Sequence, residues 1–432
     1  MNTKKAVLLL ILYFLLPFVV TGILVAGDGS VASDPMLFLS ILTGIAGYTW
    51  LMLQLVLSSR MGILEKNIGL DRLLAFHRSM PGVSIALLLL HGGVKFFYYP
   101  LSLQKLSGLI TYVGFIGAGA AAVVFLAGGG GSIGKKLRRR IYEKKGKQYQ
   151  YFKSMHNLTF LLSVIVFVHV YSSSMAEYTP FLKGYFVVVF LAGAAGYGYH
   201  KVIRPRRLPF YSVSEVLTPS DKVTTLRFNL EKGSEISHAP GQFAFFRFPG
   251  GNPGPEEHPF TISGFPEVEI TAKAVGDFTG ALSRVESGTL VRIDGPYGVF
   301  SCRNYSGDMP RVFIAGGIGI TPFLSMLRAL HRDGENHRPL IIWGVKTAED
   351  LVYLEEVRRG GELFEIVEEN DGPEGRHGRI DRKMLEEILS GELVERALFL
   401  VCGPPLMMKS VIRDLKSLGV RGRRIIVERF SL

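Results

Sequence analysis

Cysteine is scarce in this chain of 432 residues: Cys302 and Cys402 are the only two, and they form no CxxC pair. The scarcity excludes a disulfide framework and disfavours an iron–sulfur cluster or a structural zinc site. The sequence also has no DxDxDG calcium loop and no proline-rich stretch that would bind an adaptor domain. We therefore expect no obligate regulatory subunit.

Charged residues are sparse in residues 1–200, whereas residues 206–432 have the composition of an ordinary soluble protein. The apolar stretches of the first half are long enough to cross a lipid bilayer as helices. Six such spans are predicted, at 6–26, 36–58, 72–95, 107–127, 153–173 and 180–199.

The net charge of +12 is unevenly distributed, since segment 135–147 alone carries eight Lys and Arg residues against one Glu. Beside hydrophobic spans, such a segment is typical of a cytoplasmic loop that faces anionic lipid. Nucleic-acid binding is disfavoured because no base-stacking aromatic residues alternate with the basic ones. Basic residues also precede the first span, follow the second and follow the sixth. This pattern predicts a multi-pass protein of the cell (plasma) membrane with both termini in the cytoplasm.

The first span has a second interpretation. Lys4 and Lys5 precede it, and the small residues Val25, Ala26 and Gly27 end it, as in a cleaved signal peptide. Its apolar region is long for a signal peptide, which favours a retained helix. Both interpretations leave the other five spans in the same orientation.

Two predicted spans carry paired histidines: His77 and His91 lie on the third, and His156 and His169 on the fifth. The spacings of 14 and 13 residues separate each pair by about 20 Å along a helix. Neutral imidazole is a good axial ligand of haem iron. We therefore predict an inner haem between His77 and His156 and an outer haem between His91 and His169.

Polar contact between helices is the alternative role for histidine in a membrane, and it is common for a single residue. Four histidines paired at matching depths favour ligation, because polar groups in lipid are costly. A spacing of 14 returns to nearly the same helix face, whereas 13 residues do not. The fifth span must therefore bend, bulge or present its histidines at different azimuths. We expect His200, at the inner edge beside Lys201, to be an interfacial residue rather than a ligand.

Residues 206–300 alternate short strands with Gly and Pro turns, which predicts a small antiparallel barrel. His258-Pro259-Phe260-Thr261 stands at a strand start, and Gly276-Asp277-Phe278-Thr279-Gly280 precedes a short helical stretch. Small residues and a Thr hydroxyl at a helix N-terminus suit a pyrophosphate. Taken singly, each motif is better explained as a turn with a capped helix.

From residue 311 the pattern becomes strand, loop and helix, which predicts a doubly wound parallel sheet. A buried strand at 311–315 leads into a turn with Gly316, Gly317 and Gly319, and a helix begins at Thr321. Bare backbone N–H groups at a helix N-terminus suit a phosphate, although a GGIGIT turn alone is a weak signal.

The motifs follow the order HPFT, GDFT, GPYG (295–298), GGIGITP, CGPP (402–405) and a near-terminal aromatic, Phe430. This order resembles the ferredoxin-reductase-like flavoprotein module. Joined to a six-helix domain with paired histidines, it resembles the NADPH oxidase and ferric reductase superfamily. The resemblance implies a transmembrane di-haem domain at 1–205, an FAD-binding β-barrel at 206–308 and an NAD(P)H-binding α/β domain at 309–432.

The resemblance also implies roles for particular residues. Thr261, Cys402 and Phe430 would be catalytic: Thr261 near the reactive flavin nitrogen, Cys402 near the hydride path, and Phe430 stacked over the flavin. Ser431 and Leu432 follow Phe430, whereas many oxidases of this superfamily end on the aromatic residue. The residues that would bind cofactors are His258, Pro259, Phe260, Thr261, Gly276, Phe278, Thr279, Gly316, Gly317, Gly319, Thr321, Lys346, Cys402, Gly403, Pro404 and Phe430.

The implied activity is electron transfer from cytoplasmic NADPH through FAD and two b-type haems to O₂ outside, which produces superoxide. A ferric-chelate reductase would use the same electron path. A haem-bearing membrane subunit without catalytic activity is a third possibility, disfavoured by the complete flavin and nucleotide motifs. No acidic residue occupies the turn after strand 340–344, and Lys346 lies there. This favours NADPH, with NADH also used.

Overall fold

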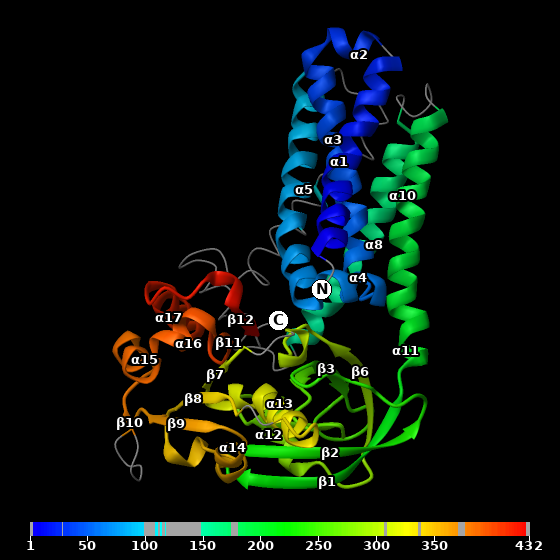
Figure 1. Ribbon diagram of the computed structural model, residues 1–432. Helices are drawn as coiled ribbons and strands as arrows, with labels where there is room; N and C mark the ends of the chain where they lie inside the picture. Colours follow the sequence, from blue (N-terminus) through cyan, green and yellow to red (C-terminus); the bar gives the residue numbers. More distant parts are fainter. Residues whose placement is uncertain are drawn as a thin grey trace. The chain divides into compact units, whose positions relative to one another are not determined.

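The computed structural model describes residues 3–27, 29–98, 109–110, 113–114, 117, 148–173, 180–305, 309–335, 338–369 and 376–428. The chain divides into two compact units, residues 2–205 and residues 206–432 (Figure 1). The described residues of the first unit are mostly helical, and the second unit contains all of the strands that the structure describes.

Long apolar helices make up the first unit. Among the described residues, four are long and apolar enough to cross a membrane, and a shorter apolar stretch runs from Thr159 to Tyr171. The helices are α1 (Thr3–Gly27), α2 (Gly29–Ser33), α3 (Pro35–Leu57), α4 (Gly62–Ile68), α5 (Leu70–Tyr98), α8 (Gln148–Tyr171), α10 (Pro180–Gly198) and α11 (Arg204–Arg207), with a π-helical turn at Tyr199–Ile203 between the last two.

Five predicted spans coincide with α1, α3, α5, α8 and α10. The predicted span at 107–127 lies almost wholly outside the described residues, so the number six stays a prediction. The predicted span at 180–199 matches α10, and the π-turn and α11 continue the helical backbone beyond it to Arg207. Hydropathy marks the end of an apolar stretch, but it does not mark the end of a helix that continues into polar surroundings.

Helix α1 packs on α3 through a polar contact that proline makes necessary. Pro17 lies inside α1 and has no N–H, so the carbonyl of Tyr13 lacks its usual helical donor. The indole Nε1 of Trp50 donates to that carbonyl at 3.0 Å, and Gln54 Nε2 donates to the Tyr13 hydroxyl at 2.7 Å. Satisfied backbone groups are required in lipid, and α3 supplies the missing donor here.

The first lobe of the second unit is an antiparallel sheet with strand order β4-β3-β6-β1-β2-β5. An isolated bridge between Ile262 and Ile270 joins the two edges, and the Ser263 N–H donates to the Glu269 carbonyl at 2.7 Å. We call residues 262–264 and 269–271 the seam of the barrel. The strands are β1 (Phe210–Ser220), β2 (Val223–Lys232), β3 (Phe243–Arg247), β4 (Glu257–Thr261), β5 (Glu269–Lys273) and β6 (Leu290–Tyr297), with α12 (Asp277–Ala281) after β5.

The second lobe is a parallel sheet with strand order β10-β9-β8-β7-β11-β12. Phe313 and Ala315 of β7 pack with α13 on one face, and Val312 and Ile314 pack with α15 and α17 on the other. The elements are β7 (Arg311–Gly316), α13 (Thr321–Arg332), β8 (Leu340–Val345), α14 (Leu354–Gly360), β9 (Glu362–Val367), β10 (Arg376–His377), α15 (Arg382–Ile388), α16 (Gly391–Arg396), β11 (Leu398–Cys402), α17 (Pro405–Ser417) and β12 (Ile425–Glu428).

Candidate functional site

His91 on α5 is held against α3 by its ring nitrogen Nδ1. Nδ1 lies 2.7 Å from the carbonyl oxygen of Ser40 and 3.1 Å from the Ser40 hydroxyl. A carbonyl only accepts, so Nδ1 carries the proton and donates to it. In that tautomer the lone pair of His91 lies on Nε2. This is the form in which histidine ligates a metal, with its other nitrogen fixed by a backbone carbonyl.

The close approach of His91 to α3 depends on Gly44. A Cβ at position 44 would lie 2.8 Å from Nδ1 of His91 and 3.0 Å from its Cε1. Contacts that short do not occur, so a larger residue would displace the imidazole. Sequence reasoning missed both Ser40 and Gly44, and their spacing of four residues on one helix face is the signal that could have found them.

The other predicted ligands are placed to different degrees. His169 lies on α8, and its pairing with His91 stays a prediction. His77 lies on α5 and is half-buried, whereas the side chain of His156 on α8 lies outside the description. The backbone of α8 is α-helical from Gln148 to Tyr171, so of the three alternatives for the fifth span a bulge is not the one found there. His200 lies in the π-helical turn after α10 and is half-buried.

These residues fit a haem on the chemistry of the donors. A haem iron takes two axial ligands, and a neutral imidazole with a fixed Nδ1–H supplies one of them. His91 and His169 would hold the outer haem, and His77 and His156 the inner one.

The HPFT motif forms strand β4, as its place at a strand start predicts. The imidazole of His258 stacks on Phe278 of the GDFT motif, with ring centroids 3.7 Å apart. Phe260 lies beside the same ring, at 6.2 Å, and Thr261 is buried at the strand end. Two motifs that lie about twenty residues apart in the sequence thus form one aromatic cluster that would border the flavin.

The GDFT motif differs from the prediction that it precedes a helix, because Asp277 to Thr279 form the first turn of α12 itself. The Thr279 hydroxyl accepts from the backbone N–H groups of Val275 and Gly276, at 3.0 and 3.1 Å. Its first task is therefore to cap a short helix, because Thr at N3 satisfies amides that the helix leaves open. A role at the FAD pyrophosphate stays a proposal.

The glycine turn after β7 meets the end of β11. A Cβ on Gly319 would lie 2.5 Å from the Cys402 carbonyl and 2.8 Å from the Gly403 Cα, so only glycine fits there. Gly317 has φ of +54° with open space around it, and the Trp343 indole donates to its carbonyl at 3.0 Å. The turn is thereby fixed, with Gly317 and Ile318 half-buried, directly before α13 begins at Thr321. This arrangement suits a dinucleotide phosphate.

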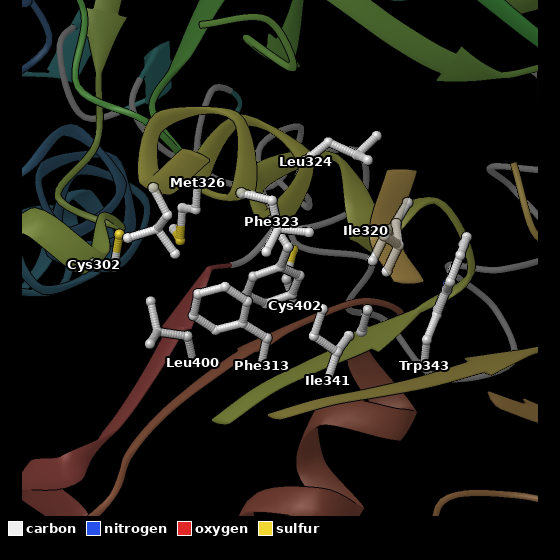
Figure 2. Close-up of a cluster of buried hydrophobic side chains, with 14 of the residues drawn as sticks. Cys302, Phe313, Ile320, Phe323, Leu324, Met326, Ile341, Trp343, Leu400 and Cys402 are labelled. Carbon is white, nitrogen blue, oxygen red and sulfur yellow. The ribbon is translucent and has the colours of Figure 1, made fainter. Parts of the chain in front are cut away.

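Cys402 is fully buried at the end of β11, in the core shown in Figure 2. Glu428 of β12 pairs with it in register, and its carboxylate lies close to Gly298 of the GPYG motif. Burial and the nearby Glu428 charge raise the pKa of the Cys402 thiol well above its usual range, so the thiol stays protonated. Glu428 was missed from the sequence, although it stands two residues before Phe430. Phe430 lies outside the described residues.

Lys346 lies after β8, where the sequence shows no acidic residue, but the fold brings one to it. Glu369, from the segment after β9, forms an ion pair with Lys346, with 3.1 Å between Lys346 Nζ and Glu369 Oε1. The lysine side chain is 70% exposed. Sequence reasoning could not find this partner because it comes from the next strand of the sheet. The charge of Lys346 is thus shared before any nucleotide arrives, so the preference for NADPH over NADH stays open.

Comparisons with known proteins match both units. Residues 43–167 match the family model "Ferric reductase like transmembrane component", and residues 313–413 match "Oxidoreductase NAD-binding domain".

A ferredoxin–NADP reductase B of Sorangium cellulosum is 33% identical over 182 residues, which cover 39% of this chain and 74% of that protein. A probable dihydroorotate dehydrogenase B (NAD⁺) electron transfer subunit of Methanocaldococcus jannaschii is 30% identical over 200 residues, 46% of this chain and 70% of that protein. The FAD/NAD-binding domain of a nitric oxide dioxygenase from Vibrio cholerae aligns with a TM-score of 0.45 at 23% identity, over 52% of this chain and 98% of that one.

The chain belongs to the ferric reductase-like flavoprotein oxidoreductases, in which a ferric reductase-like transmembrane component is joined to a ferredoxin–NADP reductase-like module. The predictions of an oxidoreductase and of a membrane-embedded first unit are confirmed. Such a combination supports electron transfer across the membrane, and a haem subunit without catalytic activity no longer accounts for the chain.

Proposed function

We propose that the protein transfers electrons from cytoplasmic NADPH across the cell membrane to O₂ on the outer face and releases superoxide. The observation that carries the proposal is the placement of His91, whose Nδ1–H is held by the Ser40 carbonyl at 2.7 Å so that Nε2 is available to iron. When bound, FAD takes a hydride from the nucleotide and passes on single electrons, which two b-type haems accept.

The second unit supports the first part of this function. The Gly316–Thr321 turn would hold the nucleotide phosphates, and Gly403 and Pro404 lie directly beside Gly316. The cluster of His258, Phe260 and Phe278 would border the flavin. Cys402 of the CGPP motif pairs with Glu428, and the Glu428 carboxylate lies close to Gly298 of the GPYG motif. The hydride path would run beside these two motifs. These residues orient the reactants and keep water out, and they supply no redox centre of their own.

The membrane unit supports the second part. Ligation by two histidines each would hold the haem irons, and it would leave an acceptor to be reduced without binding iron. We place the inner haem between His77 and His156, the outer haem between His91 and His169, and both termini in the cytoplasm, because the basic loops demand that orientation.

A ferric chelate is the alternative acceptor, and the match to the ferric reductase-like transmembrane component favours it. Both activities need the same electron path, so the decisive experiment compares acceptors on one sample. Purified protein with FAD and NADPH would be assayed for superoxide in air and for ferric-chelate reduction without oxygen. Superoxide-dismutase-sensitive turnover that exceeds ferric turnover supports the first proposal, and the opposite order supports the second.

The absorption spectrum tests the haem proposal independently of any acceptor. Protein expressed with ample haem should show two low-spin b-type haems per chain and one flavin, and NADPH should reduce them. Protein that binds no haem, or that keeps both haems after all four histidines are replaced, would refute it.

A further inference from the structure

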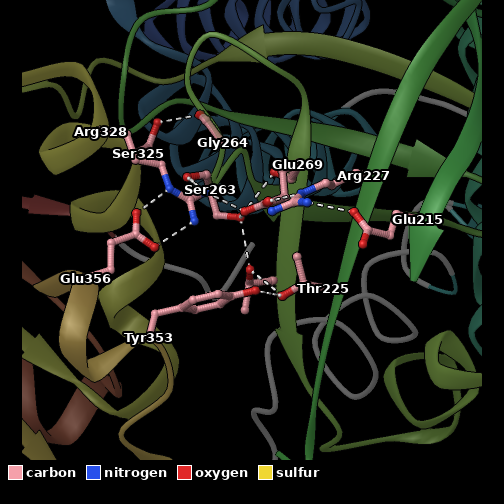
Figure 3. Close-up of polar contacts among 11 residues, drawn as sticks. Glu215, Thr225, Arg227, Ser263, Gly264, Glu269, Ser325, Arg328, Tyr353 and Glu356 are labelled. Carbon is pink, nitrogen blue, oxygen red and sulfur yellow. Dashed lines mark hydrogen bonds and ion pairs between the residues drawn. The ribbon is translucent and has the colours of Figure 1, made fainter. Parts of the chain in front are cut away.

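Helix α13 contacts the barrel seam through two hydrogen-bond donors on one of its faces. Ser325 and Arg328 are three residues apart and therefore point the same way. The Ser325 hydroxyl donates to the Gly264 carbonyl at 2.9 Å, and Arg328 Nη1 donates to the Ser263 carbonyl at 3.0 Å (Figure 3). Carbonyls at a strand end need partners from outside the sheet, and α13 supplies them here.

The same arginine anchors an ion-pair network. Arg328 Nη1 contacts Glu269 Oε1 at 2.5 Å, while its Nε and Nη2 make a two-point contact with Glu356 of α14 at 2.6 and 3.1 Å. Glu269, with a side chain only 4% exposed, also accepts from Arg227 of β2 at 3.0 Å. Burial alone lowers the pKa of the Arg328 guanidinium, but the Glu356 and Glu269 carboxylates raise it above its ordinary value. The guanidinium therefore stays charged at every physiological pH.

These contacts lie between the turn that would hold the nucleotide and the strand that would border the flavin. Thr321, at the start of α13, is one turn from Ser325, and the glycine turn that would hold the nucleotide ends there. The seam residues Ser263 and Gly264 follow Thr261, the last residue of the flavin strand β4, by two and three residues. One rigid helix thus spans from the nucleotide turn to the end of the flavin motif.

We propose that Arg328, together with Glu269, is a positioning residue that fixes α13 against the seam and so sets the distance between the nicotinamide and the flavin. The proposal rests on the function proposed above. In the step concerned, one hydride leaves the nicotinamide, which is oxidised, and joins the flavin, which is reduced. Misplacement by about 1 Å costs such reactions up to about 100-fold in rate.

The test measures flavin reduction by NADPH in the full-length protein, without oxygen, by rapid mixing. For Arg328→Met we expect the limiting rate at saturating NADPH to fall by about 10- to 100-fold. We expect the apparent nucleotide Kd to change less than about threefold and the nicotinamide–flavin charge-transfer absorbance to weaken. Arg328→Lys keeps the charge but loses the two-point contact, so its limiting rate should lie between those of the wild type and Arg328→Met. Arg382→Met, which breaks an exposed Arg–Glu pair on α15, is the matched control and should match the wild type.

The double variant Arg328→Met/Glu269→Gln separates positioning from the cost of a buried, unpaired charge. A folded double variant that contains FAD and still reduces it slowly supports the proposal. A wild-type rate in either variant would overturn it, and so would a loss confined to nucleotide affinity. A double variant that cannot hold FAD would also overturn it, because the network would then support the barrel rather than position α13. If NADPH does not reduce the flavin of the wild-type protein, the proposed function itself is refuted instead.

Discussion

The long helices of the first unit and the lobes of the second unit bury polar groups in opposite ways. In the long helices of the first unit, the buried polar side chains that the structure describes are uncharged: Thr21, Ser40, Thr43, Thr49, Gln54, Ser84 and Ser163. Several donate to the carbonyl one turn earlier on their own helix, as Thr43 does to Leu39 and Thr49 does to Ile45, both at 2.7 Å. In the second unit, the buried Glu269 carboxylate forms ion pairs with Arg227 of β2 and Arg328 of α13 and accepts from the Ser263 hydroxyl.

The difference follows from the medium that surrounds each unit, which is lipid for the long helices and water for the second unit. Lipid cannot hydrogen-bond to an exposed polar group, so a helix must satisfy its side chains locally and without charge. A soluble lobe can bury a carboxylate if several donors surround it, and the arrangement then depends on every one of them. Removing one buried polar group from the first unit should therefore cause a small, local loss of stability. Removing one from the network of the second unit should cause a large loss.

The largest expected effect comes from His91, which the membrane unit would use as a haem ligand. His91→Leu should remove the outer haem and lower electron transfer to an external acceptor by at least about 100-fold, because the axial ligand is lost. NADPH-dependent reduction of a dye at the flavin should persist. Haem content by absorption and the two activities check this, and loss of dye reduction with normal FAD content would contradict the modular division.

Glu269→Gln should show how abruptly the soluble network fails. The change leaves Arg227 and Arg328 without their shared carboxylate, so the free energy of unfolding should fall by about 3–5 kcal/mol. Denaturant unfolding followed by flavin fluorescence measures this change. Glu386→Gln, in an exposed pair with Arg382, is the control and should cost under about 1 kcal/mol. Equal costs in the two variants would remove the contrast between buried and exposed charge.

Gly44→Ala tests how tightly α3 holds the His91 imidazole. The added methyl meets Nδ1 at 2.8 Å, so overpacking should cost about 1–3 kcal/mol and weaken the bond to the Ser40 carbonyl. A weaker bond makes the imidazole a poorer electron donor, so the midpoint potential of one haem should rise. Redox titration checks this, with Gly22→Ala on α1, where the added methyl meets open space, as the control. An unchanged pair of potentials would show that Gly44 does not shape the ligand.

Thr49→Val should have a small effect because it removes only neutral hydrogen bonds, one within α3 and one to α10. Thr49 bonds to the Ile45 carbonyl and lies 2.6 Å from the Tyr185 hydroxyl. Hydrogen bonds of this kind in membrane proteins contribute about 1 kcal/mol or less. Thermal unfolding in detergent should therefore shift slightly, with full haem content. A loss as large as that of Glu269→Gln would contradict the comparison of the two units.

The smallest effect concerns pH and His238, buried between the carbonyls of Ala239 and Pro266. Burial lowers the pKa of His238 below its ordinary value of 6.5. The unfolded chain then binds a proton more readily than the folded one, so the stability is present above pH 6.5 and is lost as the pH falls below it. Lowering the pH from about 7 to about 5 should reduce the stability of His238→Gln less than that of the wild type. Identical slopes in thermal unfolding would contradict this.

Sequence reasoning placed the motifs better than it placed their partners. The helix after the glycine turn begins at Thr321 as predicted, because a glycine turn followed by Thr-Pro is a local signal. The partner of Lys346 was missed because Glu369 comes from a neighbouring strand. Similarly, nothing near Arg328 in the sequence points to Glu269, which lies on a barrel strand some sixty residues earlier.

The sequence by itself determined the class of protein: apolar length and basic loops define a membrane unit, paired histidines suggest haem, and ordered motifs define a flavin and nucleotide unit. These properties are local or periodic, so they can be recognised without a fold. Only the tertiary structure decided that Ser40 fixes the tautomer of His91, that Glu428 lies beside Cys402, and that Arg328 joins α13 to the barrel seam. Such contacts link distant segments, and their geometry arises only when the chain packs.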